Sequence, residues 1–116
     1  MTVAFHTKNA NRGQVQVDIR IQASLNVSAF MARQKVTGYV VDHISDHMAG
    51  DEPSLVVEAD RLLWRVPVQL AVLPQGRLGQ VGTIDVDAQN GQLLTNSLLI
   101  EDIKRNARAL VERSIA

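Results

Sequence analysis

The chain contains no cysteine, few aromatic residues and no excess of charge of either sign. Without cysteine there is no disulfide framework, no thiolate metal site and no cysteine nucleophile, so packing has to provide the stability. The 12 basic residues balance 12 acidic ones, which removes the bulk attraction that sequence-independent binding to nucleic acid requires. Phe5, Phe30, Tyr39 and Trp64 are the aromatic residues, too few to offer stacking platforms for single strands. Nucleic acid is therefore not an expected partner.

The chain also lacks a long apolar run. A membrane-spanning helix needs roughly 18 or more apolar residues in succession, and the most apolar stretch, Leu62–Leu73, is interrupted by Arg65, Pro67 and Gln69. No membrane span is expected. Residues 1–13 mix polar and basic residues with few apolar ones, which does not match a secretory signal. We expect a flexible N-terminal segment there and a cytoplasmic location.

The composition and the length of the chain match one folded domain covering residues 1–116. The apolar share of 46% and the charged share of 21% are those of a globular chain and too apolar for intrinsic disorder. The length fits a single core.

The first half predicts a strand followed by a long helix. From Val15 to Gln22 apolar and polar residues alternate with the period of a half-buried strand. Asn26 and Ser28 are candidate N-caps for a helix that extends to about Met48, and residues 50–53 break it. Its expected apolar stripe consists of Phe30, Thr37, Val40, Val41, Ile44 and Met48.

The second half predicts a meander of three antiparallel strands and a final helix. Leu55 and Val57 are expected to face inward before a tight turn near Asp60. The next strand has one apolar face formed by Leu62, Trp64, Val66, Val68, Leu70 and Val72. In the third strand, from Val81 to Ala88, Ile84 and Val86 face inward and two aspartates face outward. This register sets Val66 opposite Val86 and Arg65 opposite Asp87, as an outer-face ion pair.

The segment after the third strand contains a second turn signal. Asn90-Gly91 favours positive φ, so Gln92–Leu94 is expected to fold back before Asn96 or Ser97 caps the final helix. The apolar stripe of that helix consists of Leu99, Ile100, Ile103, Ala107, Leu110 and Val111. The predicted fold is α+β, in the order strand, long helix, three-stranded antiparallel meander, C-terminal helix, with the sheet curled around the long helix.

Three segments of this region carry a resemblance to a known family: Val56-Val57-Glu58, Leu63–Val68, and Ile84–Leu94, which contains Val-Asp-Ala followed by Gly-Gln-Leu-Leu. The region resembles a PepSY-type module, a small α+β domain of cystatin-like shape, and Val86–Leu94 matches the end of that family's last strand. The resemblance implies an antiparallel sheet packed on one helix. It also implies a role in inhibiting or chaperoning peptidases and in protein interaction, without catalytic residues.

Tyr39, His43 and His47 are spaced by four on the predicted long helix and would project from one edge of its apolar stripe. Two imidazoles there could hold a metal or line a binding cleft. Zinc requires at least a third protein ligand, and the metalloprotease pattern requires Glu where this chain has Ile44. The other interpretation places both histidines at the helix C-terminus, where positive charge suits the dipole. We expect no metal site, with His43 and His47 as its only candidates.

Nothing in the sequence predicts an enzyme. The serines fall at caps, helix surfaces and turns, not in a strand–turn–helix elbow. Asp85 and Asp87 alternate on a solvated face, and the glycines at 76, 79 and 82 lie between strands, where a hairpin turn and a bulge explain them. We expect no catalytic residue and no cofactor.

The sequence therefore predicts a non-enzymatic protein- or peptide-binding module, in which an open sheet edge is available for strand addition. A PepSY-like regulator or inhibitor is the specific form of this hypothesis. The alternative is a small-molecule or metal-binding protein using a cleft near Tyr39, His43 and His47. A third class is a nucleic-acid regulator acting through the basic final helix. A homodimer is expected, because the apolar stripe of that helix has to be covered.

Overall fold

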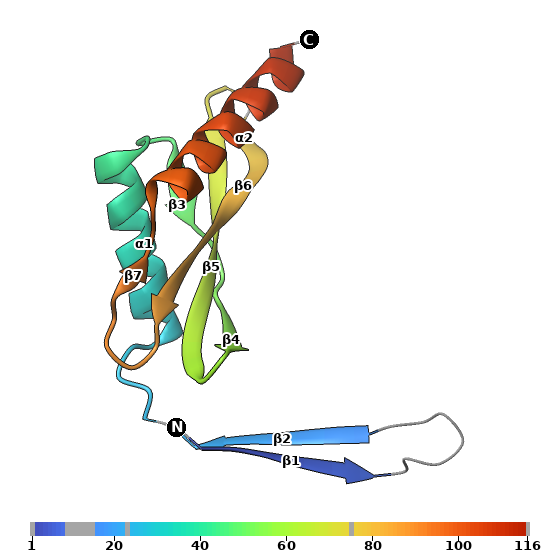
Figure 1. Ribbon diagram of the computed structural model, residues 1–116. Helices are drawn as coiled ribbons and strands as arrows, with labels where there is room; N and C mark the ends of the chain where they lie inside the picture. The colour runs from blue at the N-terminus through green and yellow to red at the C-terminus, as the bar shows by residue number, and fades with distance from the viewer. Residues whose placement is uncertain (1, 9–15, 23, 75, 116) are drawn as a thin grey trace.

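The computed structural model describes residues 2–8, 16–22, 24–74 and 76–115, the first two ranges as paired backbone. Over these residues it contains two helices and a five-stranded antiparallel sheet, so the predicted α+β class is confirmed (Figure 1). The helices are α1 (Ala29–His43) and α2 (Ser97–Ile115). The sheet consists of β3 (Met48–Gly50), β4 (Ser54–Glu58), β5 (Arg61–Val72), β6 (Gly76–Asp87) and β7 (Leu93–Leu94).

The N-terminal part forms a separate two-stranded sheet. β1 (Thr2–Lys8) pairs antiparallel with β2 (Gln16–Gln22). β2 confirms the strand predicted from the alternation, but its place in the main sheet was wrong, because it pairs with β1 and not with β5 or β6. The expected flexible segment, residues 1–13, contains β1, and residues 9–13 lie outside the described residues. Alternation identifies a strand but not its partner.

Helix α1 begins as predicted and ends earlier. The Ser28 hydroxyl accepts a hydrogen bond from the Met31 N–H at 3.1 Å, which caps the first turn. The helix ends at His43, not near Met48, and the Ile44 N–H still donates to the Val40 carbonyl. Met48 pairs with Leu70 as the first residue of β3. Pairing with β5 therefore replaces the last predicted turn of the helix.

The face of α1 that packs on the sheet also differs from the prediction. Ala32, Val36 and Val40 are buried, whereas Phe30 is 67% exposed and Val41 is 43% exposed. Apolar residues occur all round this helix, so their periodicity does not select one face. The structure selects the face with the smallest side chains, which permits close approach to the sheet.

β3 and β4 form one interrupted strand along β5. Gly50 pairs with Val68, the Asp51 N–H donates to the Pro67 carbonyl at 2.8 Å, and Ser54 pairs with Arg65. Residues 52–53 therefore oppose the single residue 66, which is a β-bulge. Residues 50–53 were predicted to break the helix, and instead they interrupt this strand.

The register between β5 and β6 is shifted by two residues from the prediction. Val66 pairs with Ile84, and Arg65 pairs with Asp85, not Asp87. The Arg65 guanidinium donates to both oxygens of Asp85, at 3.0 and 2.9 Å, and this raises the pKa of Arg65. The cause of the shift is an earlier chain reversal: β6 begins at Gly76, which pairs with Val72, whereas the third strand was predicted to begin at Val81. Because two is an even number, the inward and outward faces stay as predicted.

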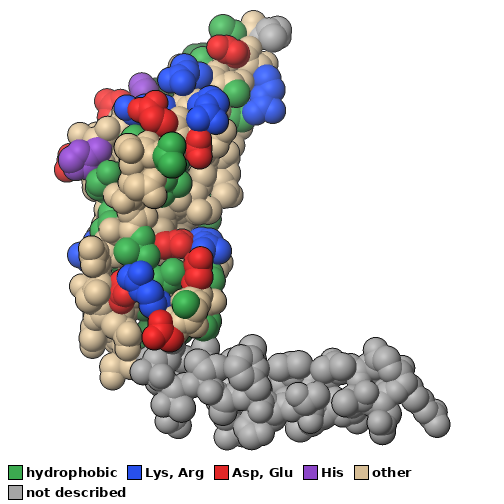
Figure 2. Space-filling view, in the orientation of Figure 1, with side chains coloured by type: hydrophobic (Ala, Val, Ile, Leu, Met, Phe, Trp, Pro, Cys, Tyr) green, Lys and Arg blue, Asp and Glu red, His purple; other side chains and the backbone are tan. Residues whose placement is uncertain are grey.

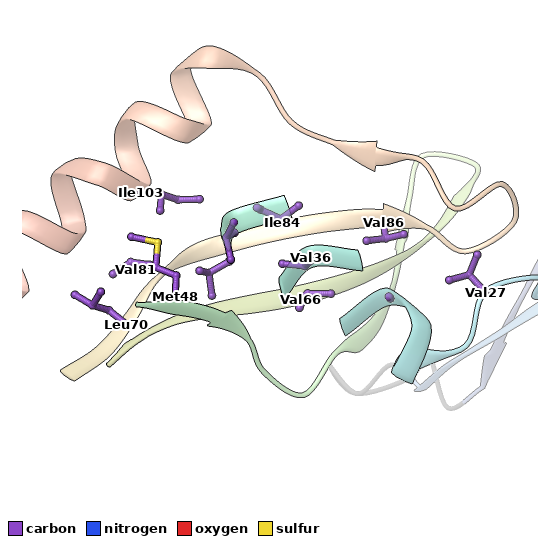
Figure 3. Close-up of a cluster of buried hydrophobic side chains, with 12 residues drawn as sticks. Val27, Val36, Met48, Val66, Leu70, Val81, Ile84, Val86 and Ile103 are labelled. Carbon is purple, nitrogen blue, oxygen red and sulfur yellow. The ribbon is translucent and has the colours of Figure 1, made fainter. Parts of the chain in front are cut away.

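Both helices pack on one face of the sheet. The core combines α1, β3, β5, β6 and α2 in a single cluster, much of which is visible in Figure 3. The predicted face of β5 is confirmed by buried Leu62, Val66, Val68 and Leu70, but Leu55 and Val57 on β4 are 47% and 42% exposed. These two residues pair with Trp64 and Leu62 and so lie on the predicted inward face, but the rest of the described chain does not bury them. The core residues are Val27, Ala32, Val36, Val40, Met48, Val66, Val68, Leu70, Val81, Ile84, Val86 and Ile103.

The apolar stripe of α2 is largely covered by its own chain, although Val111 is 37% exposed. The Asn96 side chain accepts from the Leu99 N–H at 2.9 Å, which confirms the predicted cap. Ile103 is fully buried, and Leu99, Ala107 and Leu110 pack against the core. α2 therefore packs on β6 at one end of the core, and most of the stripe does not require a second subunit.

The turn after β6 is organised by Asp87, which is only 6% exposed, so the prediction that it lies on a solvated face was wrong. Its Oδ1 atom accepts from the N–H groups of Gln89 at 2.8 Å and Asn90 at 3.0 Å, and Arg61 donates to Oδ2 at 3.1 Å. Burial acts to raise the pKa of Asp87, but these N–H groups and Arg61 outweigh it and lower the pKa. Gly91 has a φ of 77°, which confirms the predicted positive φ at that residue, whereas positive φ at Asn90, also predicted, is not observed.

The lowered pKa predicts an acid-dependent loss of stability at Asp87. The folded state favours the carboxylate, so this contribution is present above the unfolded value, roughly pH 4, and is lost as pH falls through the folded value. The difference in unfolding free energy between wild type and Asp87→Asn is expected to shrink as pH falls from 6 towards 3. Urea denaturation over this range measures it, and a constant difference would contradict the assignment.

Candidate functional site

A cleft lies on the helical face of the sheet because α1 is too short to cover β5. α1 has 15 residues, about 22 Å at the rise of an α-helix. β5 has 12 residues, about 40 Å at the rise of a strand. α1 covers one half of the strand and α2 packs on β6, so the far end of β5 is left between them. The cleft there has a volume of about 420 Å³.

The floor of the cleft is apolar and its walls come from three separate segments. Met48, Leu70 and Val72 form the floor. The turn between α1 and β3 forms one wall and the second half of α2 forms the other. The complete lining consists of Ile44, Ser45, His47, Met48, Leu70, Val72, Lys104, Ala107, Arg108, Val111 and Glu112.

The rim on α2 carries both signs of charge. Lys104 and Arg108 lie one turn apart, followed by Glu112 one turn later. Lys104 Nζ is 3.8 Å from Glu101 Oε1, whereas Arg108 forms no ion pair with another residue that the structure describes. Acidic and basic side chains are interspersed along this helix in Figure 2. Arg108 is therefore the cation best placed to meet an incoming anionic group.

The structure separates the three residues predicted to share a helix edge. Tyr39 and His43 lie on α1 with their ring centroids 4.5 Å apart. His47 lies outside the helix, in the turn before β3, with Nε2 3.6 Å from Asp46 Oδ1. Of the three, only His47 lines the cleft. The predicted spacing of four failed because the helix ends at His43.

The candidate metal ligands are not brought together with a third ligand. Across residues 24–74 and 76–115, no group of three or more His, Asp or Glu side chains has the arrangement of a metal site. Asp85 is held by Arg65 and Asp87 by Arg61 and the turn backbone, so both carboxylates have structural partners. The cleft has an apolar centre, formed by Met48, Leu70 and Val72, and charged side chains at its rim.

Comparison with family models, with curated proteins and with solved structures finds no match to this chain. None of the helices in the described part of the chain is long and apolar enough to cross a membrane.

Sequence reasoning missed most of the cleft and one structural side chain on α2. The cleft is built from residues whose proximity depends on where α1 ends, which the helical pattern did not show. Asn106 Nδ2 donates to the Val81 carbonyl at 2.8 Å, at a β6 residue that pairs with no β5 residue. An asparagine in the middle of an amphipathic helix was the available signal, because such residues commonly satisfy a specific backbone group.

Proposed function

We propose that this protein is a non-enzymatic protein- or peptide-binding module and that its cleft binds an apolar segment of the partner. The observation that carries the proposal is the open apolar cleft of about 420 Å³ between the α1–β3 turn and α2. Val111, on its α2 wall, is 37% exposed. Apolar surface gathered in a concave site gains free energy when an apolar side chain covers it.

The shape of the cleft favours a peptide over a small molecule. Small-molecule sites bury roughly 70–90% of their ligand, whereas this cleft is open to solvent instead of enclosed. A helix or extended segment laid across it covers the opening with its own backbone. Lys104 and Arg108 beside the apolar floor favour a segment that combines apolar residues with an acidic one.

The resemblance of Val86–Leu94 to PepSY-type modules supports the same class of function. Members of that family are associated with peptidase inhibition and protein interaction, so a PepSY-like regulator or inhibitor is the particular role we propose. The cytoplasmic location predicted from the sequence stays a prediction.

Substitution of Val111 tests the proposal. Peptides selected from a random display library against the full chain are expected to contain apolar residues next to Asp or Glu. Val111→Asp is expected to weaken their binding at least about tenfold, which corresponds to about 1.4 kcal/mol. Fluorescence anisotropy measures the affinity, and Val41→Asp is the matched control because Val41 is a similarly exposed helical valine outside the cleft. Equal binding to wild type and Val111→Asp would place the peptide site elsewhere.

A small apolar molecule is the second candidate ligand, because the cleft volume falls within the roughly 300–1,000 Å³ of known ligand sites. Decanoate, an apolar chain with one carboxylate, is the probe for this candidate. If decanoate binds more tightly than every selected peptide and Val111→Asp abolishes its binding, the small-molecule function replaces the peptide-binding one.

A homodimer, predicted from the sequence, is also part of the proposed function, but the reason for expecting it changes. The apolar stripe of α2 is largely covered by the sheet, so the original reason for dimerisation is removed. A dimer has to use another surface.

A further inference from the structure

The hydrogen bonds of β5 show which backbone N–H and C=O groups of β3 and β4 point away from the sheet. The Leu62 carbonyl accepts from the Ala88 N–H at 2.9 Å, and the Pro67 carbonyl accepts from the Asp51 N–H at 2.8 Å. Even-numbered residues in this part of β5 therefore direct their backbone groups to the β6 side, and odd-numbered residues direct theirs to β3 and β4. Leu55 and Val57 pair with Trp64 and Leu62. Their N–H and C=O groups consequently point away from the sheet.

Gly50 on β3 has the same orientation, but its outward groups are occupied. It pairs with Val68, an even-numbered residue. Its N–H donates to Thr37 Oγ1 at 2.9 Å, and its carbonyl accepts from Arg33 Nε at 3.0 Å. Both partners are side chains of α1, which closes this edge of the sheet.

The opposite edge of the sheet is covered in part. β7 pairs with Asp85 and Val86 of β6, and Asn106 on α2 donates to the Val81 carbonyl. Such coverage prevents an edge strand from pairing with another chain.

In the part of the chain that the structure describes, β4 lacks such coverage at two adjacent outward-facing positions, Leu55 and Val57. Within the described residues, no side chain or strand forms a hydrogen bond with the outward backbone groups of Leu55 and Val57. Their side chains are 47% and 42% exposed. An edge strand with free backbone groups and branched apolar side chains has the features that favour strand addition.

We propose that the occupant of this edge is β4 of a second copy, antiparallel across a two-fold axis at Val56. In this register Leu55 lies opposite Val57 of the partner subunit, and the partner subunit's Leu55 lies opposite Val57. Each of these two pairs exchanges two N–H to carbonyl hydrogen bonds. The four exposed apolar side chains then pair on the helical face, and the two copies share one continuous sheet.

The neighbouring registers are less favourable. An axis at Leu55 sets Val57 opposite Pro53 of the partner subunit, which has no N–H to donate. An axis at Val57 sets Leu55 opposite Ala59, which lies in the β4–β5 turn with a φ of 56°. With the axis at Val56, Glu58 opposes the partner subunit's Ser54, so no like charges meet within β4, and Glu58 keeps its 3.0 Å ion pair with Arg65.

This interface does not depend on the proposed peptide site. β4 pairs with residues 61–65 of β5, whereas the cleft lies over Leu70 and Val72 near the other end of that strand. Dimerisation through β4 therefore leaves the cleft open in both copies.

Proline at an outward-facing position tests the interface. The full chain is expected to sediment as a dimer at tens of micromolar, and Val57→Pro is expected to sediment as a monomer. This substitution removes an N–H that faces the second copy and none that bonds to β5. Far-UV circular dichroism checks that the variant is folded. A wild-type monomer at these concentrations, or a folded Val57→Pro variant that stays dimeric, would overturn the proposal.

Paired charge substitutions test the register without proline. Leu55→Lys with Val57→Lys sets like charges opposite each other and is expected to weaken dimerisation at least about tenfold. Leu55→Lys with Val57→Glu sets opposite charges against each other in the proposed register only, and is expected to restore the dimer. Val111→Asp is the control and is expected to remain dimeric. A dimer formed by the double lysine variant but not by the lysine–glutamate variant would exclude the β4 interface.

Discussion

Replacing Trp64 with alanine is expected to lower the free energy of unfolding by about 3 kcal/mol. The indole is partly buried against the core, and its Nε1–H donates to the Val27 carbonyl at 2.7 Å. Val27 and Asn26 are in turn bound through their N–H groups to the Ala88 carbonyl, at 3.1 and 3.0 Å. Trp64 therefore holds the segment that precedes α1 as well as filling space.

Trp64→Phe separates these two contributions. Phenylalanine keeps most of the packing but leaves the Val27 carbonyl without the indole donor, which is expected to cost about 1 to 3 kcal/mol. Urea denaturation of the three proteins gives the comparison. A loss below about 1 kcal/mol for Trp64→Ala would show that the packing and the hydrogen bond contribute little.

The second large effect is expected where α2 meets β6. Ile103 is fully buried, and Ile103→Ala is expected to cost about 3 kcal/mol. A Cβ atom added at Gly82 would lie 2.8 Å from Ile103 Cγ1. Gly82→Ala alone is therefore expected to cost about 1 to 3 kcal/mol, because the side chain of Ile103 has to move.

The double variant tests whether these two positions share one contact. In Gly82→Ala with Ile103→Ala the new methyl group occupies space that the isoleucine vacates, so the combined loss is expected to be at least about 0.5 kcal/mol smaller than the sum. Gly38→Ala is the matched glycine control, since a Cβ atom there meets nothing within 4 Å. Strictly additive losses would show that α2 does not press on β6 at this point.

Local sequence signals with a strong physical basis predicted local structure correctly. Ser28 and Asn96 cap helices because a short oxygen-bearing side chain satisfies free N–H groups of the first turn. The Asn90-Gly91 turn formed because glycine accepts positive φ. The alternation in β5 gave its buried face because side chains alternate in every strand whatever its partner.

The candidate site was less predictable because it depends on where elements end. Tyr39, His43 and His47 would share a helix edge only if α1 continued past His43, and the pairing of Met48 with Leu70 prevents this. Of these three residues, His47 alone reached the cleft. The cleft itself combines residues from 44 to 112, and no local pattern records that proximity.

The sequence by itself determined the α+β class, the order α1, β4, β5, β6, α2, and the buried faces of β5 and β6, but not β3. It did so because periodicity, caps and turns are properties of neighbouring residues. Only the tertiary structure decided which face of α1 is buried, how β5 and β6 are registered, that α2 shares a sheet face with α1, and which sheet edge stays open. These depend on contacts between distant residues, such as Ile103 against Gly82 and Thr37 against Gly50. The free energy of such a contact is set by the fit of two surfaces, which neither segment specifies alone.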